Sequence, residues 1–178
     1  MDAQAIIDSL TPLVPGASFE AAPSVDFATV YVPAGQIVAA CQALRDSLSF
    51  EVLAEVTCAD YLPSAPRYEV VYHLLSVSKR LRLRLKVRVA ADGTVPTVQG
   101  VYPSAGWLER EVWDMFGIVF DGHPDLRRLL MPEDWEGHPQ RKDYPVQIQK
   151  AAQTYAPLEV TQEQFRASLE RDRVKRTH

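Results

Sequence analysis

Cysteine is scarce in this chain of 178 residues, which contains only Cys41 and Cys58 and no Cys-x-x-Cys pair. A four-thiolate iron–sulfur cluster or zinc site therefore cannot be built from this chain alone. Because no secretory signal is recognisable at the N-terminus, we interpret both cysteines as buried thiols of a protein in a reducing compartment.

Long apolar runs are absent as well. No stretch approaches the ~20 consecutive apolar residues that a membrane-spanning helix requires. If the protein works at a membrane, we expect another subunit to hold it there. The sequence also lacks a Gly-rich phosphate loop, a Gly-x-Ser-x-Gly elbow and a Cys–His arrangement near either cysteine, which argues against the common nucleotide-binding and hydrolytic sites.

The composition is that of a folded protein. Hydrophobic residues make up 47% of the chain, a share that is typical of globular proteins and argues against disorder. The length favours one domain with an appended segment. The net charge of −4 does not favour nonspecific binding to nucleic acid or anionic lipid by the whole molecule.

Apolar periodicity predicts a two-layer α+β domain with helices on one face of a mixed β-sheet. Apart from a central helix, helices are expected at 2–10, 34–48 and 161–173, and strands at 18–22, 26–32, 50–58, 67–78, 81–89 and 95–101. Alternation in the strand at 50–58 places on one face Val52, Ala54, Val56 and Cys58. Cys41 lies on the apolar stripe of the helix at 34–48, so we interpret it as a core residue that packs on the sheet.

The strand at 81–89 carries a cation at every second position. Its leucines and valines are expected to point inward, and the outward cations are Arg80, Arg82, Arg84, Lys86 and Arg88. The favoured interpretation is a solvated sheet face whose cations pair with Glu51, Glu55 and Glu69 on neighbouring strands. A protein-facing edge is the next choice. Nucleic acid is the last, because the strand has no interleaved aromatic residues on which bases could stack.

The stretch from Trp107 to Pro145 organises the chain and contains all three tryptophans. Its first part predicts a helix with Ser104 as N-cap and Gly117 at the C-terminal end. An apolar stripe at the helical period consists of Leu108, Val112, Met115 and Phe116. Opposite this stripe lie Glu109, Arg110, Glu111, Trp113 and Asp114. Since Arg110 and Asp114 are four positions apart, we expect them to meet on the helix surface.

After Gly117, prolines recur too often for a long helix, at Pro124, Pro132, Pro139 and Pro145. The large apolar residues between them argue against disorder. We therefore expect an extended, proline-rich C-terminal arm that lies on the surface of its own domain or of a partner. The expected organisation is an α+β core domain at 1–117, the proline-rich arm at 118–157 and a polar helix or tail at 158–178.

The charged residues of this stretch allow two interpretations. Glu109, Glu111 and Asp114 could act as general acid and base. Glu109 and Glu111, however, are two positions apart on a helix and point in different directions. Four arginines are close by in the sequence: Arg110, Arg127, Arg128 and Arg141. They favour buried ion pairs that hold the arm onto the helix, and we place this structural network ahead of catalysis.

The histidines and aromatic residues also have two interpretations each. His123 and His138, with aspartates nearby, could suggest a metal site, but both lie in Gly-His-Pro and no His-x-x-x-His spacing exists. We expect each imidazole to be a hydrogen-bonded turn residue. A quinone or flavin ring could stack on Trp107, Trp113, Trp135 and Tyr144. We favour these four as anchors of the arm on its domain or on a partner, since tryptophan and tyrosine are common at interface hot spots.

The same residues resemble the signature of a known family. Between Glu109 and Pro145 the chain reads, in order, Glu-Arg-Glu-x-x-Asp-Met-Phe-Gly-Ile, Gly-His-Pro-Asp-Leu-Arg-Arg, Met-Pro-Glu-Asp-Trp, Gly-His-Pro and Arg-Lys-Asp-Tyr-Pro. This string is similar to the C subunit, the 30 kDa subunit family, of the respiratory NADH–quinone oxidoreductase, complex I. Two positions depart from the family pattern without touching its charged core: Gly106, where Asn or Asp is commoner, and Gln140, where an apolar residue is commoner.

The resemblance implies the same α+β layout and a non-catalytic scaffold role in the hydrophilic arm of the complex, on the cytoplasmic side of the cell inner membrane. There the chain would dock the D subunit near the quinone site, close to the B subunit. It would hold no cofactor or metal, since FMN and iron–sulfur clusters belong to partner subunits of a complex that uses NADH and quinone. The residues expected at the partner interface are Trp107, Glu109, Arg110, Glu111, Trp113, Asp114, His123, Arg127, Arg128, Trp135, His138, Arg141, Lys142, Asp143 and Tyr144.

Two alternatives stay open. Homologous subunits resemble this chain in membrane-bound hydrogenases and in chloroplast-type complexes that do not take NADH, and the module that receives the electrons lies in other chains. A free-standing module that binds anions or nucleic acid through the basic strand is the last hypothesis. A salt-dependent gel shift would be needed to support it.

Overall fold

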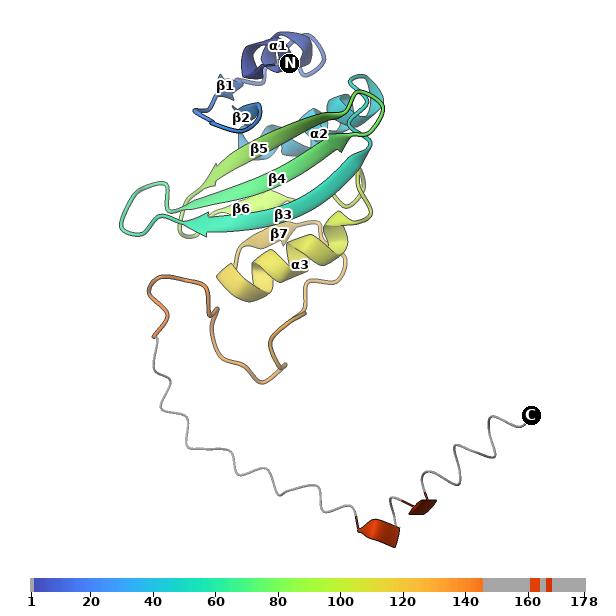
Figure 1. The fold of residues 1–178 in the computed structure, drawn as a ribbon. Coiled ribbons are helices and arrows are strands. Elements are labelled where there is room, and N and C mark those ends of the chain that lie inside the picture. The colour runs from blue at the N-terminus through green and yellow to red at the C-terminus, as the bar shows by residue number, and fades with distance from the viewer. Residues whose placement is uncertain (1, 146–160, 164–165, 168–178) are drawn as a thin grey trace, which may run out of the picture. The chain divides into compact units, whose positions relative to one another are not determined.

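The computed structural model describes residues 2–145, 161–163 and 166–167 (Figure 1). The chain divides into two units, Met1–Tyr144 and Pro145–His178, and the fold and the site belong to the first unit. The helix expected at 161–173 lies largely outside the described residues, and so does the end of the proline-rich arm from residue 146 onward.

The helices begin and end close to the expected positions. The helices of the first unit are α1 (Ala3–Leu10), α2 (Ile37–Asp46) and α3 (Ala105–Phe116), with the 3-10 turn η1 (Ala34–Gln36) directly before α2. Asp2 caps α1 by accepting a hydrogen bond from the N–H of Ala5 at 2.9 Å. The helix expected at 34–48 is thus a 3-10 turn followed by a shorter α-helix, consistent with the glycine in its first turn.

The strands form a mixed sheet, as the alternating pattern indicates. The strands are β1 (Glu20–Ala21), β2 (Thr29–Tyr31), β3 (Val52–Asp60), β4 (Tyr68–Ser76) and β5 (Leu81–Val89). Their order is β1-β2-β5-β4-β3, in which β2 and β5 are parallel and the other neighbours are antiparallel. β2 therefore extends the antiparallel β3–β4–β5 meander at the edge formed by β5.

A second, two-stranded sheet joins β6 (Thr94–Pro96) to β7 (Val119–Asp121) in parallel. The strand expected at 95–101 is shorter than predicted, and β7 was not expected, because the chain after Gly117 was interpreted as irregular. Gly117 has a left-handed backbone, with φ 75°. It turns the chain at the end of α3, so that Val119 lies beside Thr94 and the arm begins as a strand.

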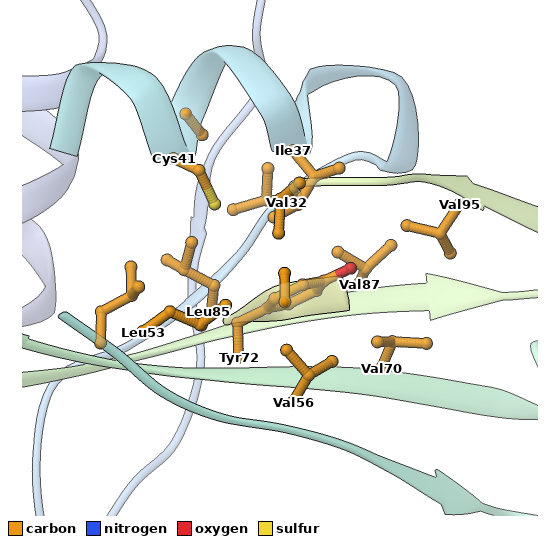
Figure 2. Packing of buried hydrophobic residues seen from close by; sticks show 14 of the residues in the cluster. Val32, Ile37, Cys41, Leu53, Val56, Val70, Tyr72, Leu85, Val87 and Val95 are labelled. Atoms are coloured by element: carbon orange, nitrogen blue, oxygen red, sulfur yellow. The ribbon is translucent and has the colours of Figure 1, made fainter. Parts of the chain in front are cut away.

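One hydrophobic core lies on a single face of the five-stranded sheet. The inward residues of β3, β4 and β5 share this core with apolar residues of α1, α2 and α3. Figure 2 shows Ile37 and Cys41 of α2 pointing towards Tyr72, Leu85 and Val87 of the sheet. The two-layer arrangement with helices on one face is confirmed, and Cys41 is a buried core residue as expected.

The predicted alternation in β3 is wrong in its first half. Leu53 is buried, whereas Val52 and Ala54 are exposed. The pairing register with β4 shifts between Leu53 and Glu55. Such a bulge inserts one extra residue into a strand and reverses the facing of the residues before it. Val56 and Cys58, beyond the bulge, lie on the buried face as expected.

The cations of β5 do face outward, but most of their predicted partners are wrong. Among the described residues, Glu69 is the one expected partner that is confirmed, while Glu51 accepts hydrogen bonds from Ser78 and the N–H of Val77 instead. The ion pairs of this strand are Lys86–Glu69 at 2.8 Å, Arg84–Asp26 at 3.0 Å and Arg88–Glu20 at 3.2 Å. Because β5 also neighbours β2, its cations reach acids near β1 and β2 rather than those of β3.

Candidate functional site

The candidate site is built on α3, which buries its apolar stripe against the sheet. Val112, Met115 and Phe116 are buried, Leu108 is half-buried, and Gly117 ends the helix as predicted. Ser104 precedes the helix but does not cap it through its side chain. Its hydroxyl lies 3.3 Å from the carbonyl oxygen of Leu53, to which it donates, and so it ties the start of α3 to β3.

The charged side of α3 is buried, and the expected buried ion pair between the arm and the helix is confirmed by Arg128 and Asp114, 2.7 Å apart. Glu109 and Asp114 are fully buried, and Arg110 is 7% exposed. The proline-rich arm folds back along this side and covers Arg110 and Asp114, as the hydrogen bonds of its residues 127–131 to these two side chains indicate. The expected Arg110–Asp114 contact is therefore replaced by contacts of each residue with the arm.

Asp114 is the centre of this arrangement. Its Oδ2 atom accepts hydrogen bonds from three consecutive backbone N–H groups, those of Leu129 (3.0 Å), Leu130 (2.7 Å) and Met131 (2.9 Å). Its Oδ1 atom accepts one from Arg128 at 2.7 Å. Burial alone would raise the pKa of Asp114, but these four donors outweigh it and hold the pKa below its ordinary value. The carboxylate thus replaces the missing backbone partners of the arm.

Two guanidinium groups hold the carbonyl groups of the arm. Arg110 donates from Nε to the oxygen of Arg127 at 3.1 Å and from Nη2 to that of Arg128 at 2.9 Å. Arg128 itself donates to the carbonyl oxygens of Trp135 at 2.6 Å and Gly137 at 3.1 Å. The planar fork of arginine suits such paired acceptors, so each group fixes the course of several arm residues.

The arm also covers the C-terminal end of α3, whose last carbonyl groups have no partner within the helix. Arg141 donates from Nε to the oxygen of Phe116, and the Nδ1 atom of His138 lies 3.0 Å from the oxygen of Asp114. A cation at this end also interacts favourably with the helix dipole. A Cβ atom on Gly117 would lie 2.3 Å from Nη2 of Arg141, so glycine is required here for the arm to approach.

An ion-pair cluster that the sequence analysis missed fixes the end of the described arm. Arg67 donates to both carboxylate oxygens of Asp60, at 3.0 and 2.8 Å, and to both of Asp143, at 3.1 and 2.7 Å. Asp60 also accepts the N–H of Lys142 at 2.9 Å. The hydrogen bonds of Arg67 lower the pKa of both carboxyl groups. The sequence signal for this cluster was a charged residue at each end of the β3–β4 loop, Asp60 and Arg67, because a hairpin brings the two ends together.

Glu109 has a different environment from Asp114. It accepts hydrogen bonds from the Thr97 hydroxyl and from the N–H of Val98, the latter at 2.8 Å. Burial raises the pKa of Glu109, and these two donors offset the effect only in part. Glu109 thus links α3 to the segment after β6. Thr97 was missed, because a lone threonine in a turn carries no pattern.

Both Gly-His-Pro histidines are hydrogen-bonded turn residues, as expected. The N–H of Asp125 donates to Nδ1 of His123 at 3.1 Å, and Nε2 of His123 lies 3.0 Å from the oxygen of Gly106. His138 holds the helix end described above. Burial lowers the pKa of His138, and the nearby Arg141 and Arg128 add to this effect. Within the described residues, no group of three or more His, Cys, Asp or Glu side chains is placed to hold a metal ion.

The aromatic residues divide into covered and exposed ones. Trp113 packs edge-on against His138 with ring centroids 5.9 Å apart, and Tyr144 donates to the oxygen of Glu136 at 3.0 Å. Trp135 is half-buried in the arm. Trp107, by contrast, is 62% exposed, with the Arg110 guanidinium 4.9 Å from the centre of its ring. Three of the four are therefore packed within the arm and its junction with α3.

The structure thus brings most of the predicted site residues together as one hydrogen-bonded junction between α3 and the proline-rich arm. Glu111 differs, because its half-buried side chain makes no hydrogen bond or ion pair within the described residues. The side chain of Lys142 is exposed, and its backbone N–H makes the contact to Asp60. None of the helices among the described residues combines the length and apolar character of a membrane span.

Comparison with known proteins identifies the family of this chain. Residues 30–150 match the model of a family described as "Respiratory-chain NADH dehydrogenase, 30 Kd subunit". The chain belongs to this family. The C subunit of NADH-quinone oxidoreductase from Salinispora arenicola is 52% identical over 122 residues, which cover 66% of this chain and 50% of the relative. The present chain thus spans about half the length of several curated relatives that it matches.

Other members are similar over more of their length. The C subunit of NADH-quinone oxidoreductase from a Roseiflexus species is 44% identical over 158 residues, which cover 87% of this chain and 91% of the relative. Among solved structures, a chain of the membrane-bound sulfane sulfur reductase, an archaeal respiratory membrane complex, superposes with a TM-score of 0.68. It is 28% identical, and the match covers 80% of this chain and 85% of that one.

Proposed function

We propose that this chain is a non-catalytic scaffold subunit in the hydrophilic arm of a proton-translocating NADH–quinone oxidoreductase. In this proposal it docks the D subunit near the quinone site, close to the B subunit, on the cytoplasmic side of the cell inner membrane. Its membership of the 30 kDa subunit family and its similarity to C subunits of NADH-quinone oxidoreductases support this assignment.

The observation that carries the scaffold role is the use of the charged motif residues. Asp114, Arg110 and Arg128 are all engaged in hydrogen bonds that hold the arm on α3. A general acid or base must reach a reacting group, whereas Glu109 and Asp114 are fully buried. The motif therefore stabilises a particular surface shape, which is what a docking subunit needs.

The proposal assigns FMN and the iron–sulfur clusters to partner subunits, and NADH and quinone to the whole complex. Burial raises the pKa of both the Cys41 and the Cys58 thiols to about 12. Both thiols lie in the hydrophobic core, and among the described residues neither belongs to a group of three or more His, Cys, Asp or Glu side chains that could hold a metal ion. Electron transfer between cofactors of other chains depends on distance, and a subunit that fixes their relative positions contributes to it without chemistry of its own.

A second candidate is the equivalent subunit of a complex that does not take NADH. The similarity to a chain of the archaeal sulfane sulfur reductase, itself a respiratory membrane complex, supports this second candidate. The scaffold role would be the same, and the reaction of the complex would differ.

Isolation of the tagged chain from mildly solubilised host membranes, with mass spectrometry of the bound proteins, tests the proposal. Co-purification of D-like, B-like and NADH-binding subunits with NADH–quinone activity is the expected result. D-like and B-like subunits together with a nickel–iron or sulfur-reducing catalytic subunit would keep the scaffold role and change the reaction. A chain that comes alone would contradict both.

A further inference from the structure

A hollow of about 250 Å³ lies beside the N-terminal half of α3 and shares Arg110 with the junction between α3 and the arm. It is open to the exterior next to Trp107. The side chains that line it include those of Gln99, Trp107, Arg110, His123, Asp125 and Arg127. Three of these, Trp107, Arg110 and Arg127, are of the types most frequent at interface hot spots.

The walls of this hollow are fixed by contacts already made. His123 is held against the oxygen of Gly106 at 3.0 Å. A Cβ atom on Gly106 would lie 2.9 Å from Cδ of Gln99, so glycine at this position gives the Gln99 side chain its place. Pre-organised walls lower the ordering cost of binding, which makes the hollow suited to receive a side chain.

The charge of the hollow is positive. Arg110 uses Nε and Nη2 to hold the arm, while Nη1 makes no hydrogen bond within the described residues. The nearest anion, Oδ2 of Asp125, lies 4.0 Å from that atom, beyond hydrogen-bond range. Arg127 bonds the same oxygen at 2.9 Å, and its side chain is 67% exposed. Two guanidinium groups thus share one carboxylate.

We propose that this hollow receives a carboxylate side chain, of aspartate or glutamate, from a neighbouring subunit. The inference rests on the proposed function, since it assumes a docked partner. A carboxylate would accept from Arg127 and from Nη1 of Arg110, which has only the long ion pair with Asp125, and the partner would cover the exposed ring of Trp107. An apolar occupant would bury the Arg110 and Arg127 guanidinium groups without an additional anion, which is costly.

A zero-length cross-link in the assembled complex tests this directly. Arg127→Lys keeps the charge and introduces an amine. A carbodiimide activates a carboxylate in contact with that amine, which then attacks it to form an amide while the reagent leaves as a urea. We expect a cross-linked peptide that joins position 127 to an aspartate or glutamate of another subunit. The matched control is Arg82→Lys, because the exposed side chain of Arg82 on β5 has no hydrogen bond or ion pair in the described part of the chain.

The outcomes separate this inference from the proposed function. If the wild-type tagged chain recovers no other subunit, both fail. If the complex is intact but position 127 cross-links only to Asp125 of its own chain, or to nothing, the carboxylate inference is overturned and the scaffold role stands. In the same membranes, Arg127→Glu should lower recovery of partner subunits about tenfold or more, as charge reversal at a close interfacial pair does, while Arg82→Glu should not. Loss of recovery with Trp107→Ala but not with Arg127→Glu would indicate an apolar occupant and also overturn the inference.

Discussion

In the core, the side chains that meet between the sheet and the helices are almost all apolar, and two buried thiols replace aliphatic groups there. Along the described part of the proline-rich arm, the polar contacts with α3 are the Arg128–Asp114 ion pair and hydrogen bonds between charged side chains and backbone groups, while Leu126 and Met131 add apolar contacts with the core. Apolar burial is non-directional and tolerates conservative exchanges. Buried polar contacts are directional, and loss of one partner leaves the other unsatisfied. The two regions should therefore respond differently to single substitutions.

Asp114→Ala is expected to have the largest effect. It removes the acceptor of one guanidinium and three N–H groups from a fully buried position. Loss of one partner of a buried ion pair costs about 3–5 kcal/mol, so the free energy of unfolding should fall by that order. Urea titrations of the whole chain measure this free energy. Tryptophan fluorescence is the probe, since all three tryptophans lie in α3 and the arm.

Leu85→Ala, which leaves a cavity in the core, is the counterpart of Asp114→Ala. It should lower the free energy of unfolding by about 2–5 kcal/mol. If the arm and the core unfold as one unit, both variants shift fluorescence and far-UV circular dichroism together. If the arm can leave α3 on its own, Asp114→Ala shifts only the fluorescence transition. An Asp114→Ala variant as stable as the wild type by both probes would show that the arm is not held by this carboxylate.

Gly117→Ala should come next in size. The residue has φ 75°, and its new Cβ atom would meet Arg141 at 2.3 Å and the His138 ring at 2.5 Å. The left-handed backbone alone costs about 1–2 kcal/mol for a residue with a side chain, and displacement of Arg141 adds to it. Gly100→Ala is the matched control, because a Cβ atom there has no neighbour within 4 Å. Equal stabilities of the two variants in urea would contradict this account of the helix end.

Glu109→Gln should have a smaller, pH-dependent effect. Because the pKa of Glu109 is raised in the folded chain, its protonated form stabilises the fold at low pH. This contribution is lost as the pH rises through the folded pKa. The glutamine amide oxygen can still accept from Thr97 and Val98. We therefore expect Glu109→Gln to gain stability relative to the wild type as the pH rises above about 4.3, the ordinary pKa of glutamic acid, and through the raised pKa of Glu109.

The measurement is the difference in free energy of unfolding between the two proteins at each pH. Taking this difference cancels the opposite trend from Asp114, whose lowered pKa stabilises the fold above its unfolded pKa. A difference that does not change with pH would mean that Glu109 has the same pKa in the folded and unfolded chain.

The contrast between core and arm also explains how much could be predicted. The strand at 81–89 and the stripe of α3 follow from apolar periodicity, since one buried face imposes a repeat on the sequence. The bulge in β3 leaves no such signal, and it changed the facing of Leu53. The burial of Glu109 and Asp114 could not be read from a helical wheel, because the residues that cover Asp114 lie about 15 positions further along the chain.

The interface residues were predicted as a group because the family motif marks them as a group. A motif does not distinguish residues that shape a surface from residues that meet a partner. The structure separates them by their contacts. Asp114, Arg128 and Arg141 are used within the chain. Trp107 and Glu111 make far less use of their side chains within the described residues, and a partner can reach them as it can the exposed Arg127.

Glu111→Ala should therefore have the smallest effect on the chain itself. Its half-buried side chain has no hydrogen bond or ion pair in the described part of the molecule, and such substitutions usually change stability by less than about 0.5 kcal/mol. Arg110→Ala should destabilise the chain, because it removes two hydrogen bonds to the arm. We expect both variants to reduce the amount of assembled complex in membranes, Arg110→Ala by loosening the arm and Glu111→Ala by removing a partner contact. Unchanged assembly with lower quinone reductase activity per complex would instead give these residues a role in turnover, and the scaffold assignment would then be wrong.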